Sequence, residues 1–286
     1  MKSSLKILVA ALFLLGIAFI QTAFADDNAA SYKIGGVEFI AVKDISANMS
    51  KNLVLNQNAA IVNEVFGDKQ GLPAAINAFL VKIDGKNILI DCGNRGGNVV
   101  KNLQSISVDP DDINIILLTH MHGDHIGGLI DDKGGKAFKN ALVFVSNDEL
   151  NYWLNSAKSQ LPLIVKQVYG SDLKTLQWDK NDIVSEIKPI KAAGHTPGHT
   201  IFEITSGGDK ILVIGDLMHI AALQTADPSL SVSYDIDPAE AAKTRADVLK
   251  YAYENNLKIA GMHIAFSGVG KITKGKDLRL YDFSPL

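Results

Sequence analysis

The segment LLTHMHGDHIGGL contains three histidines and one aspartate within six positions. His120 and His122 are two residues apart, so on an extended segment both imidazoles point the same way and can bind one ion. The glycine that follows them permits a sharp bend. Asp124 and His125 come next as neighbours and can reach a second ion. The spacing therefore predicts two metals at a strand end, unlike the i, i+4 histidine pair of helical zinc proteases.

The other histidines of the chain lie in three later segments. AGHTPGHT contains His195 and His199, IGDLMH contains Asp216 and His219, and GMHIAF contains His263. Apolar, strand-like runs precede these segments, and side chains at strand ends meet at one edge of an α/β sheet. Imidazole and carboxylate ligands suit zinc, and also manganese, iron or cobalt. We therefore predict a site for two divalent metal ions, with zinc as the first candidate.

Strand-like and helix-like stretches alternate along the chain, and these elements must position the candidate ligands. Strands are predicted at residues 35–44, 74–84, 86–93, 113–120, 141–146, 183–194, 200–206, 210–216 and 257–262. Helices are predicted at residues 97–107, 147–158 and 237–256, the second with Asn147 as its N-cap. Sheets with helices outside them, twice over, imply an α/β sandwich.

The N-terminal residues have the pattern of a signal peptide. Lys2 and Lys6 form a positive start, an uncharged run of 14 residues follows, and Ala23 and Ala25 form a small-x-small cleavage site. The run is shorter than the roughly 20 apolar residues of a membrane span. We predict a signal peptide at residues 1–25 and export to the periplasm or medium. The mature chain, residues 26–286, is predicted to be one domain without a stable membrane anchor.

The composition fits a globular protein without a nucleic-acid footprint. The chain has 286 residues, of which 47% are hydrophobic and 21% charged, and its formal net charge is −3. No block of like charge appears, so we expect a small-molecule substrate and no nucleic acid. Cys92 is the only cysteine and follows an apolar run, so we expect a buried thiol. A homodimer is one expectation for the oligomeric state.

Several motifs together resemble the metallo-β-lactamase superfamily. They are H-x-H-x-D-H at residues 120–125, the GHTPGHT segment, the later Gly-Asp pair and the last strand-end histidine. The resemblance extends over most of residues 74–266. It implies a four-layer αβ/βα sandwich with the site between its two halves.

The resemblance also implies two ligand sets that share one carboxylate. The sets are His120, His122 and His195 for one ion, and Asp124, His125 and His263 for the other. Asp216 would bridge the two ions. Asp91 matches a family position that braces the histidine loop, and His199 is expected to support the ligands without binding metal.

The bridging aspartate and the C-terminal segments narrow the resemblance further. True β-lactamases of this fold typically lack the residue that Asp216 matches. GDLMHIAALQTADPSL, YDIDPAEAAKTRADVLKYA and AGMHIAFSGVGKI resemble the methyl parathion hydrolase subgroup, whose members also hydrolyse lactones and aryl esters and are often exported. DCG replaces the usual D-T-G or D-S-G, and AFSGVG replaces a stretch with more proline. These departures leave the ligands in place and alter the expected substrate pocket.

The expected reaction follows from two cations that share one water. They would lower its pKa towards neutrality and give a bridging hydroxide. We predict a hydrolase in which this hydroxide, oriented by Asp216 and Asp124, attacks an ester, lactone or phosphotriester. The alternatives are a β-lactam or thioester hydrolase of the same fold, and a non-hydrolytic metal-binding or redox relative. Oxygen-reducing relatives carry a flavin domain, for which this chain has no room.

Aromatic side chains are candidates for the walls of the substrate pocket. The candidates are Trp153, Phe138, Tyr152 and Tyr169. For Trp153 the alternative is core packing, because it shares a helix face with Leu150 and Leu154. His219, one helical turn after Asp216, is predicted either to touch the substrate or to pack within that turn.

Overall fold

The computed structural model describes residues 27–180 and 182–286, and two β-sheets form its framework. The first sheet has the order β1-β2-β3-β4-β5-β6-β7 and the second β13-β12-β11-β10-β9-β8. The strands of the first sheet are β1 (Ala29–Ile34), β2 (Val37–Ser50), β3 (Gly71–Ile83), β4 (Lys86–Ile90), β5 (Ile113–Leu117), β6 (Leu142–Ser146) and β7 (Leu173–Leu176). Those of the second are β8 (Ile187–Lys191), β9 (Thr200–Ser206), β10 (Asp209–Val213), β11 (Lys258–Ala260), β12 (Val269–Lys274) and β13 (Tyr281–Pro285). The predicted signal peptide lies outside the described residues.

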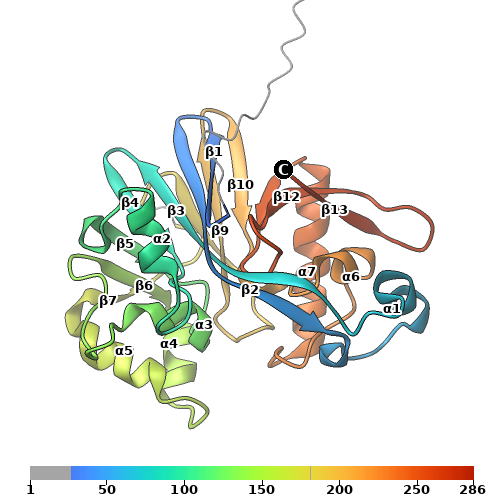
Figure 1. Ribbon diagram of the computed structural model, residues 1–286, viewed down its shortest axis with the longest axis horizontal. Coiled ribbons are helices and arrows are strands. Elements are labelled where there is room, and N and C mark those ends of the chain that lie inside the picture. Colours follow the sequence, from blue (N-terminus) through green and yellow to red (C-terminus); the bar gives the residue numbers. More distant parts are fainter. Residues whose placement is uncertain (1–26, 181) are drawn as a thin grey trace, which may run out of the picture.

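Helices cover the outer face of each sheet (Figure 1). The helices beside the first sheet are α2 (Val99–Ser105), α4 (Asn147–Leu154) and α5 (Leu161–Tyr169), and their buried residues share a core with β4, β5 and β6. The second sheet packs against α7 (Pro238–Glu254) through Leu212, Ile259 and Leu249. A separate core lies between the two sheets. The predicted four-layer αβ/βα sandwich is confirmed.

Alternating side chains of the central strands face different layers. Ile88 and Ile90 of β4 belong to the core between the sheets, whereas Leu89 faces the helices. In β5, Ile115 and Leu117 face the second sheet in the same way. Because successive side chains point to opposite faces, a strand that is buried on both faces needs an apolar residue at every position. The continuous apolar runs of the sequence follow from this layering.

Strands β2 and β3 form a long antiparallel ribbon that passes from the first sheet towards the other half of the molecule (Figure 1). The pairing runs from Glu38 opposite Lys82 to Ser50 opposite Gly71, with a register shift between Lys43 and Ile45. The far end of the ribbon packs with α1 (Ala59–Phe66) and α6 (Ala221–Ala226) in a small core of their own. The ribbon therefore spans the site between the two halves.

Several predicted elements differ from the structure at their ends. The strand predicted at residues 183–194 spans only Ile187–Lys191, and the helix predicted at 147–158 ends at Leu154. The N-cap of that helix is Ser146 and not Asn147, because the Ser146 hydroxyl accepts from Glu149 N at 3.2 Å. The helices and strands absent from the prediction are β1, β7, β12, β13, α1, α3 (Gly123–Ile126), α5 and α6. All of them have nine residues or fewer, and they form through tertiary packing and not through a strong local pattern.

Within residues 27–180 and 182–286, no helix is both long enough and apolar enough to cross a membrane.

Candidate metal centre

The histidine loop follows the end of β5. Strand β5 ends at Leu117, and Leu118 N–H then donates to Phe144 O of β6 at 2.9 Å. His122 is extended, with φ −67° and ψ 157°, and is the N-cap of the short helix α3 (Gly123–Ile126). Asp124 and His125 lie in the first turn of α3. The change from extended chain to helix at this point separates the first histidine pair from the second pair of ligand-type residues.

Asp91, directly after β4, braces this loop. Its Oδ1 accepts from Thr119 N at 2.8 Å, and its Oδ2 accepts from Thr119 Oγ1 at 2.7 Å and from His125 Nδ1 at 2.7 Å. Asp91 has φ +58°, a left-handed conformation that aspartate tolerates better than most residues. Because His125 Nδ1 is hydrogen-bonded to Asp91, the other ring nitrogen, Nε2, faces the site.

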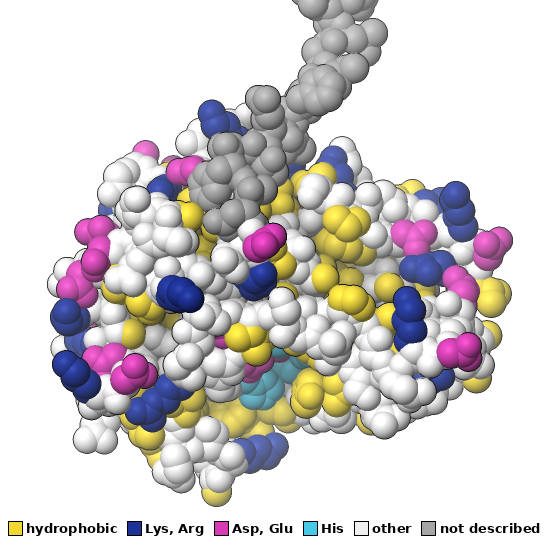
Figure 2. Space-filling view, viewed as in Figure 1, with side chains coloured by type: hydrophobic (Ala, Val, Ile, Leu, Met, Phe, Trp, Pro, Cys, Tyr) yellow, Lys and Arg dark blue, Asp and Glu magenta, His cyan; other side chains and the backbone are white. Residues whose placement is uncertain are grey.

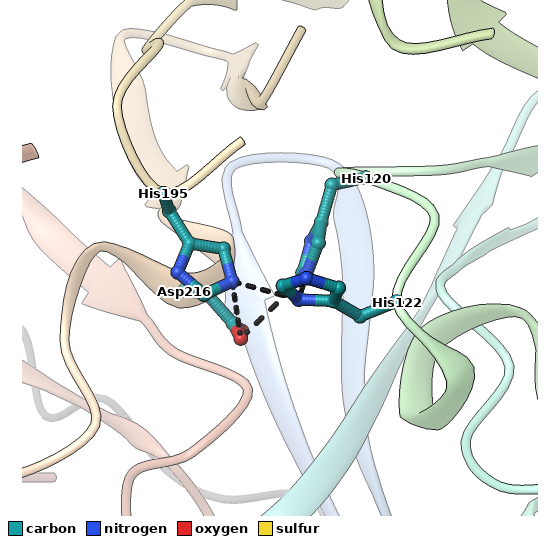
Figure 3. Close-up of side chains that lie close together, drawn as sticks. All are labelled: His120, His122, His195 and Asp216. Carbon is teal, nitrogen blue, oxygen red and sulfur yellow. Dashed lines mark hydrogen bonds and ion pairs between the residues drawn. The ribbon is translucent and has the colours of Figure 1, made fainter. Parts of the chain in front are cut away.

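Three imidazoles and one carboxylate converge in the first cluster (Figure 3). His122 Nδ1 lies 2.9 Å from His120 Nε2 and 2.9 Å from His195 Nε2. Asp216 Oδ2 lies 3.3 Å from His195 Nε2 and 3.7 Å from His120 Nε2. The histidines come from the loops after β5 and β8, and the aspartate comes from the turn after β10. The two sheets thus meet at this cluster.

The second cluster consists of Asp124, His125 and His263. His263 Nε2 lies 3.3 Å from Asp124 Oδ2, and His125 Nε2 lies 3.8 Å from Asp124 Oδ1. Asp216 reaches this cluster too, because its Oδ2 is 3.0 Å from His263 Nε2 and its Oδ1 is 3.2 Å from His125 Nε2. One carboxylate therefore lies between both clusters.

His219, which was predicted to contact the substrate or to pack within its turn, lies directly against the two clusters. Its Nε2 is 3.2 Å from Asp216 Oδ2, and its ring stacks on His263 with centroids 4.8 Å apart and planes at 16°. With Asp216 and His263 it forms a third group whose ligand atoms could hold an ion. Its side chain is buried, and Gln224 Oε1 accepts from its backbone N–H at 2.7 Å.

Two side chains hold ligand-type residues from behind. His199 Nε2 accepts from Asp216 N at 3.0 Å, while its Nδ1 donates to Ala192 O at 3.1 Å. Asp235 Oδ1 accepts from His195 Nδ1 at 2.9 Å, and its other oxygen is 3.8 Å from the buried guanidinium of Arg245. The sequence prediction gave Asp235 no role, although this residue lies in the YDIDPAEAAKTRADVLKYA segment. The hydrogen bond between His195 Nδ1 and Asp235 leaves His195 Nε2 facing the first cluster.

Glu149 is the other important residue that the sequence prediction missed. Its two oxygens accept from four donors, which are Met121 N (2.9 Å), Trp153 Nε1 (2.6 Å), Thr196 Oγ1 (2.6 Å) and Gly198 N (3.0 Å). Burial raises the pKa of Glu149, although these donors oppose the shift. The carboxylate ties the histidine loop of the first half to the GHTPGHT segment of the second half.

A comparison with protein-family models decides the family. Residues 71–263, more than half of the chain, match the model described as Metallo-beta-lactamase superfamily. The chain belongs to this superfamily. The prediction of the superfamily from the histidine motifs is therefore confirmed.

Solved structures of the superfamily are similar over nearly the whole chain. The hydrolase AbOPH is 32% identical, with a TM-score of 0.83, covering 92% of this chain and 99% of its own. AidC, a dizinc quorum-quenching lactonase solved with the product N-hexanoyl-L-homoserine, is 26% identical, with a TM-score of 0.82, covering 91% and 97%. Ribonuclease Z of Clostridium botulinum (strain Alaska E43 / Type E3) is 32% identical over 130 residues, covering 42% of this chain. The match covers only 40% of that ribonuclease.

The side chains of this superfamily member fit two divalent cations. Within the described part of the chain, His125 Nε2, Asp216 Oδ1 and His219 Nδ1 are buried without a hydrogen-bond partner. Leaving a buried polar atom unpaired costs about 1–3 kcal/mol, and two of these atoms, His125 Nε2 and Asp216 Oδ1, face each other at 3.2 Å where a cation could satisfy both. Imidazole nitrogens and carboxylate oxygens are ligands of zinc and similar cations.

Burial and neighbouring charges set the protonation of the clusters. Burial, with His195 beside it, lowers the pKa of His122 to about 3. Burial raises the pKa of Asp216, but His125 and His263 outweigh it and hold that pKa well below the ordinary value. Burial lowers the pKa of His263, but Asp216 and Asp124 outweigh it and raise that pKa to about 9. Asp216 is therefore ionised and His122 is neutral, which are the forms that bind metal, whereas His263 is protonated at neutral pH and must release its proton when a cation binds.

A cleft of about 770 Å³ opens over the clusters. Figure 2 shows histidine side chains in a hollow of the surface, with hydrophobic side chains beside it. Its lining includes the ligand-type residues, Asn94 and Arg95, Tyr234, and Ile45, Ala47, Met49 and Ile76 of the β2–β3 ribbon. The sequence prediction missed this apolar wall, because the strand was predicted to end at Asp44.

The predicted aromatic walls are corrected by the structure. Phe138 and Tyr169 are buried in the core between the first sheet and its helices, so their prediction as pocket walls is wrong. Trp153 is 4% exposed in the same core, and its ring meets His122 edge to face at 5.3 Å, so it supports a ligand-type histidine from behind. Tyr152 is half-buried, and its hydroxyl accepts from Lys158 Nζ at 2.9 Å.

Proposed function

We propose that this protein is a hydrolase that uses two divalent cations to cleave a lactone or another small ester. The observation that carries the proposal is Asp216, whose two oxygens reach both ligand clusters. A carboxylate in that position would help to hold both cations beside the cleft. When bound, such a pair supplies Lewis-acid activation of water and of the scissile carbonyl or phosphoryl group.

The residues of the chain orient the substrate around this centre. Asp124 is the most exposed of the ligand-type carboxylates, with 29% of its side chain accessible, and it lines the cleft. As an ionised carboxylate at the cleft floor, it can accept a hydrogen bond from the attacking water. Tyr234 also lines the cleft, with its ring 5.6 Å from that of His219. Its hydroxyl is available for a hydrogen bond to the substrate.

The lining of the cleft supports a small substrate over a nucleic acid. Arg95 is the one Lys or Arg among the lining residues of the described cleft. Nucleic acids are bound mainly through several Lys and Arg contacts to phosphates. The apolar ribbon side chains Ile45, Ala47, Met49 and Ile76 fit a neutral organic substrate instead. This separates the proposal from the ribonuclease activity of some relatives.

Zinc is the proposed metal, and the methyl parathion hydrolase type is the proposed subgroup. AidC is described as a dizinc lactonase, and this similarity supports zinc as the metal of this protein. The subgroup is supported by the C-terminal segments around Asp216 and His263. A phosphotriester therefore belongs among the substrates to be tested, after lactones and aryl esters.

A hydrolysis panel tests the proposal. The purified chain, stripped with a chelator and reloaded with zinc, is assayed on lactones, aryl esters, phosphotriesters, β-lactams, a thioester and single-stranded RNA. We expect turnover of lactones and aryl esters that disappears with the metal and returns on reloading. Turnover of RNA alone, or equal rates in the stripped protein, would contradict the proposal.

Export and assembly are proposed from the sequence. We infer that the chain is exported and cleaved before Asp26, since Lys2, Lys6, Ala23 and Ala25 form the expected leader pattern. The mass of the protein from the native host tests this, and an intact Met1 chain in the cytoplasm would contradict it.

A homodimer is proposed as the assembly, and light scattering of the mature chain measures it.

A further inference from the structure

The loop at residues 261–268, between β11 and β12, carries His263 and is docked on strand β3 of the other sheet. Asn77 N–H of β3 donates to Met262 O at 2.9 Å. His263 Nδ1 donates to Ala75 O, also of β3, at 3.3 Å. The first sheet thus provides the surface on which a ligand-type residue of the second half is held.

The side-chain amide of Asn77 holds the same loop on both sides of His263. Its Nδ2 donates to Ile264 O at 2.8 Å and to Gly261 O at 3.2 Å. An amide NH₂ group has two hydrogens, and both are used here. One of the two carbonyls precedes His263 by two residues and the other follows it by one. The amide therefore fixes the backbone from which the imidazole projects.

A glycine allows the loop to lie close to this amide. Gly268 has φ +77°, a conformation that favours glycine, and a Cβ at this position would lie 2.7 Å from Asn77 Nδ2. Gly261 N–H also donates to Gly268 O at 3.0 Å, so the two ends of the loop are joined beside Asn77. The loop is thus folded around one side chain of the neighbouring sheet.

Asn77 is the one polar residue of the buried stretch of β3 at residues 74–81. Its Oδ1 is buried and has no hydrogen-bond partner among the residues that the structure describes. A buried polar atom without a partner is destabilising, so an apolar side chain would suit the strand itself better. The two hydrogen bonds that Nδ2 donates to the loop account for an asparagine at this position.

We propose that Asn77 is a positioning residue for the second ligand cluster, because it directs His263 towards the two carboxylates. The inference rests on the proposed function, since it concerns the second of the two cations. His263 Nε2 lies 3.3 Å from Asp124 Oδ2 and 3.0 Å from Asp216 Oδ2. A rotation of the loop backbone would move this nitrogen away from both oxygens and weaken the site for that cation.

The support of His263 differs from that of His125 in the same cluster. Asp91 accepts from His125 Nδ1 at 2.7 Å, so a carboxylate directs that ring. The partner of His263 Nδ1 is a main-chain oxygen at the longer distance of 3.3 Å. The direction of His263 therefore depends on the backbone of its own loop, which Asn77 holds.

The zinc affinity of each cluster tests this role. The zinc-free full chain is titrated with zinc in competition with a chelator, which gives one Kd for each ion. His263→Ala identifies the Kd that belongs to the second cluster. We expect Asn77→Ala to weaken that Kd about 10- to 100-fold, as removal of a supporting partner usually does, and to leave the other Kd as in the wild type. Asn77→Asp, which keeps the size but replaces the NH₂ donor by an oxygen, should weaken the same ion.

Asn102→Ala is the matched control. Asn102 of α2 is also buried, and its Nδ2 donates to a main-chain oxygen of β2, Lys43 O, at 2.6 Å. Thermal unfolding of the zinc-free chain measures the loss of stability in each variant. Both alanine variants should lower the melting temperature, but only Asn77→Ala should weaken the second ion. An unchanged second Kd in both Asn77 variants, an equal loss at both ions, or an equal loss in Asn102→Ala overturns the proposal.

Failure of this role and failure of the proposed function give different results. A wild-type chain that binds two zinc ions and hydrolyses no substrate of the panel rejects the proposed function. The role of Asn77 stands in that case if its variants lose the second ion. Hydrolysis by a chain with two zinc ions, with an unchanged second Kd in both Asn77 variants, rejects the role of Asn77 alone. A wild-type chain with a single zinc site rejects both.

Discussion

The two halves of the molecule contribute to the metal centre in different ways. The first half supplies four ligand-type residues from one loop, between His120 and His125. The second half supplies His195, Asp216 and His263 one at a time, after three different strands. The geometry of the first set is local and is fixed by Asp91. The geometry of the second set depends on the register of a whole sheet, and on Asp235 and His199 behind the ligands.

The largest effect is expected where the two halves meet, at Asp216. Asp216→Asn keeps the size of the side chain but removes the charge that both clusters share. Activation of water by a metal pair is worth several kcal/mol, so turnover should fall at least about 100-fold. The melting temperature should fall less, because the apolar residues of β10 remain buried and only the stabilisation by bound metal is lost. Steady-state rates beside metal content check this, and near-wild-type rates with two ions bound would reject the bridging role.

Asp91 tests the brace of the first half. Asp91→Asn weakens a buried carboxylate that accepts from Thr119 N, Thr119 Oγ1 and His125 Nδ1. Loss of such a supporting partner typically costs about 10- to 100-fold in metal affinity, and we expect the upper end because three donors are affected. Competition with a zinc chelator measures the affinity. A variant with unchanged zinc affinity would show that the loop holds its shape without Asp91.

Asp235 and His199 test the same idea in the second half, with smaller effects. Asp235→Asn alters the partner of one ligand-type histidine, so zinc affinity should fall about 10-fold. His199→Asn removes the acceptor for Asp216 N but leaves the carboxylate in place, so zinc affinity and activity should each fall by about 10-fold at most. If these two variants lose more zinc affinity than Asp91→Asn does, the second half depends on its supporting residues more than the first half does. The comparison between the halves would then be reversed.

The smallest effect is expected at Glu203 of β9, whose side-chain partners Lys210 and Tyr251 are not ligand-type residues. Burial raises the pKa of Glu203, but Tyr251 and Lys210 outweigh it and hold that pKa below the ordinary value of 4.5. A lowered pKa in the folded state stabilises the fold above pH 4.5, and this contribution is lost as the pH falls through the folded pKa. Urea unfolding should therefore show wild type more stable than Glu203→Gln at pH 7, with the difference shrinking below pH 4.5. A difference that grows in acid would contradict this assignment.

The sequence alone predicts the first half of the site better than the second, for a physical reason. Four ligand-type residues within six positions form a local pattern that needs no knowledge of the fold. Glu149 and Asp235 lack such a pattern, because their partners lie far away in sequence: Glu149 is 49 residues from Gly198, and Asp235 is 40 residues from His195. Burial of both carboxylates becomes intelligible only when the two sheets are packed together.

The substrate pocket is the least predictable part for a related reason. Phe138 and Tyr169 are aromatic residues of the kind that often line substrate pockets. Both are instead buried in the core between the first sheet and its helices. Aromatic residues on a helix or beside a strand look alike in sequence whether they face a core or a cleft. The apolar wall of the cleft is instead on the β2–β3 ribbon. Strand β2 continues to Ser50, beyond the strand that the alternating pattern predicted at residues 35–44.

The metal content of the active enzyme tests the central claim most directly. The mature chain is dialysed against metal-free buffer, and bound metal is measured by elemental analysis beside turnover of a lactone on the same sample. Two ligand clusters that share Asp216 predict two transition-metal ions per chain, with activity proportional to the fraction of chains that hold both. Full activity with one ion per chain, or with none, would contradict the account.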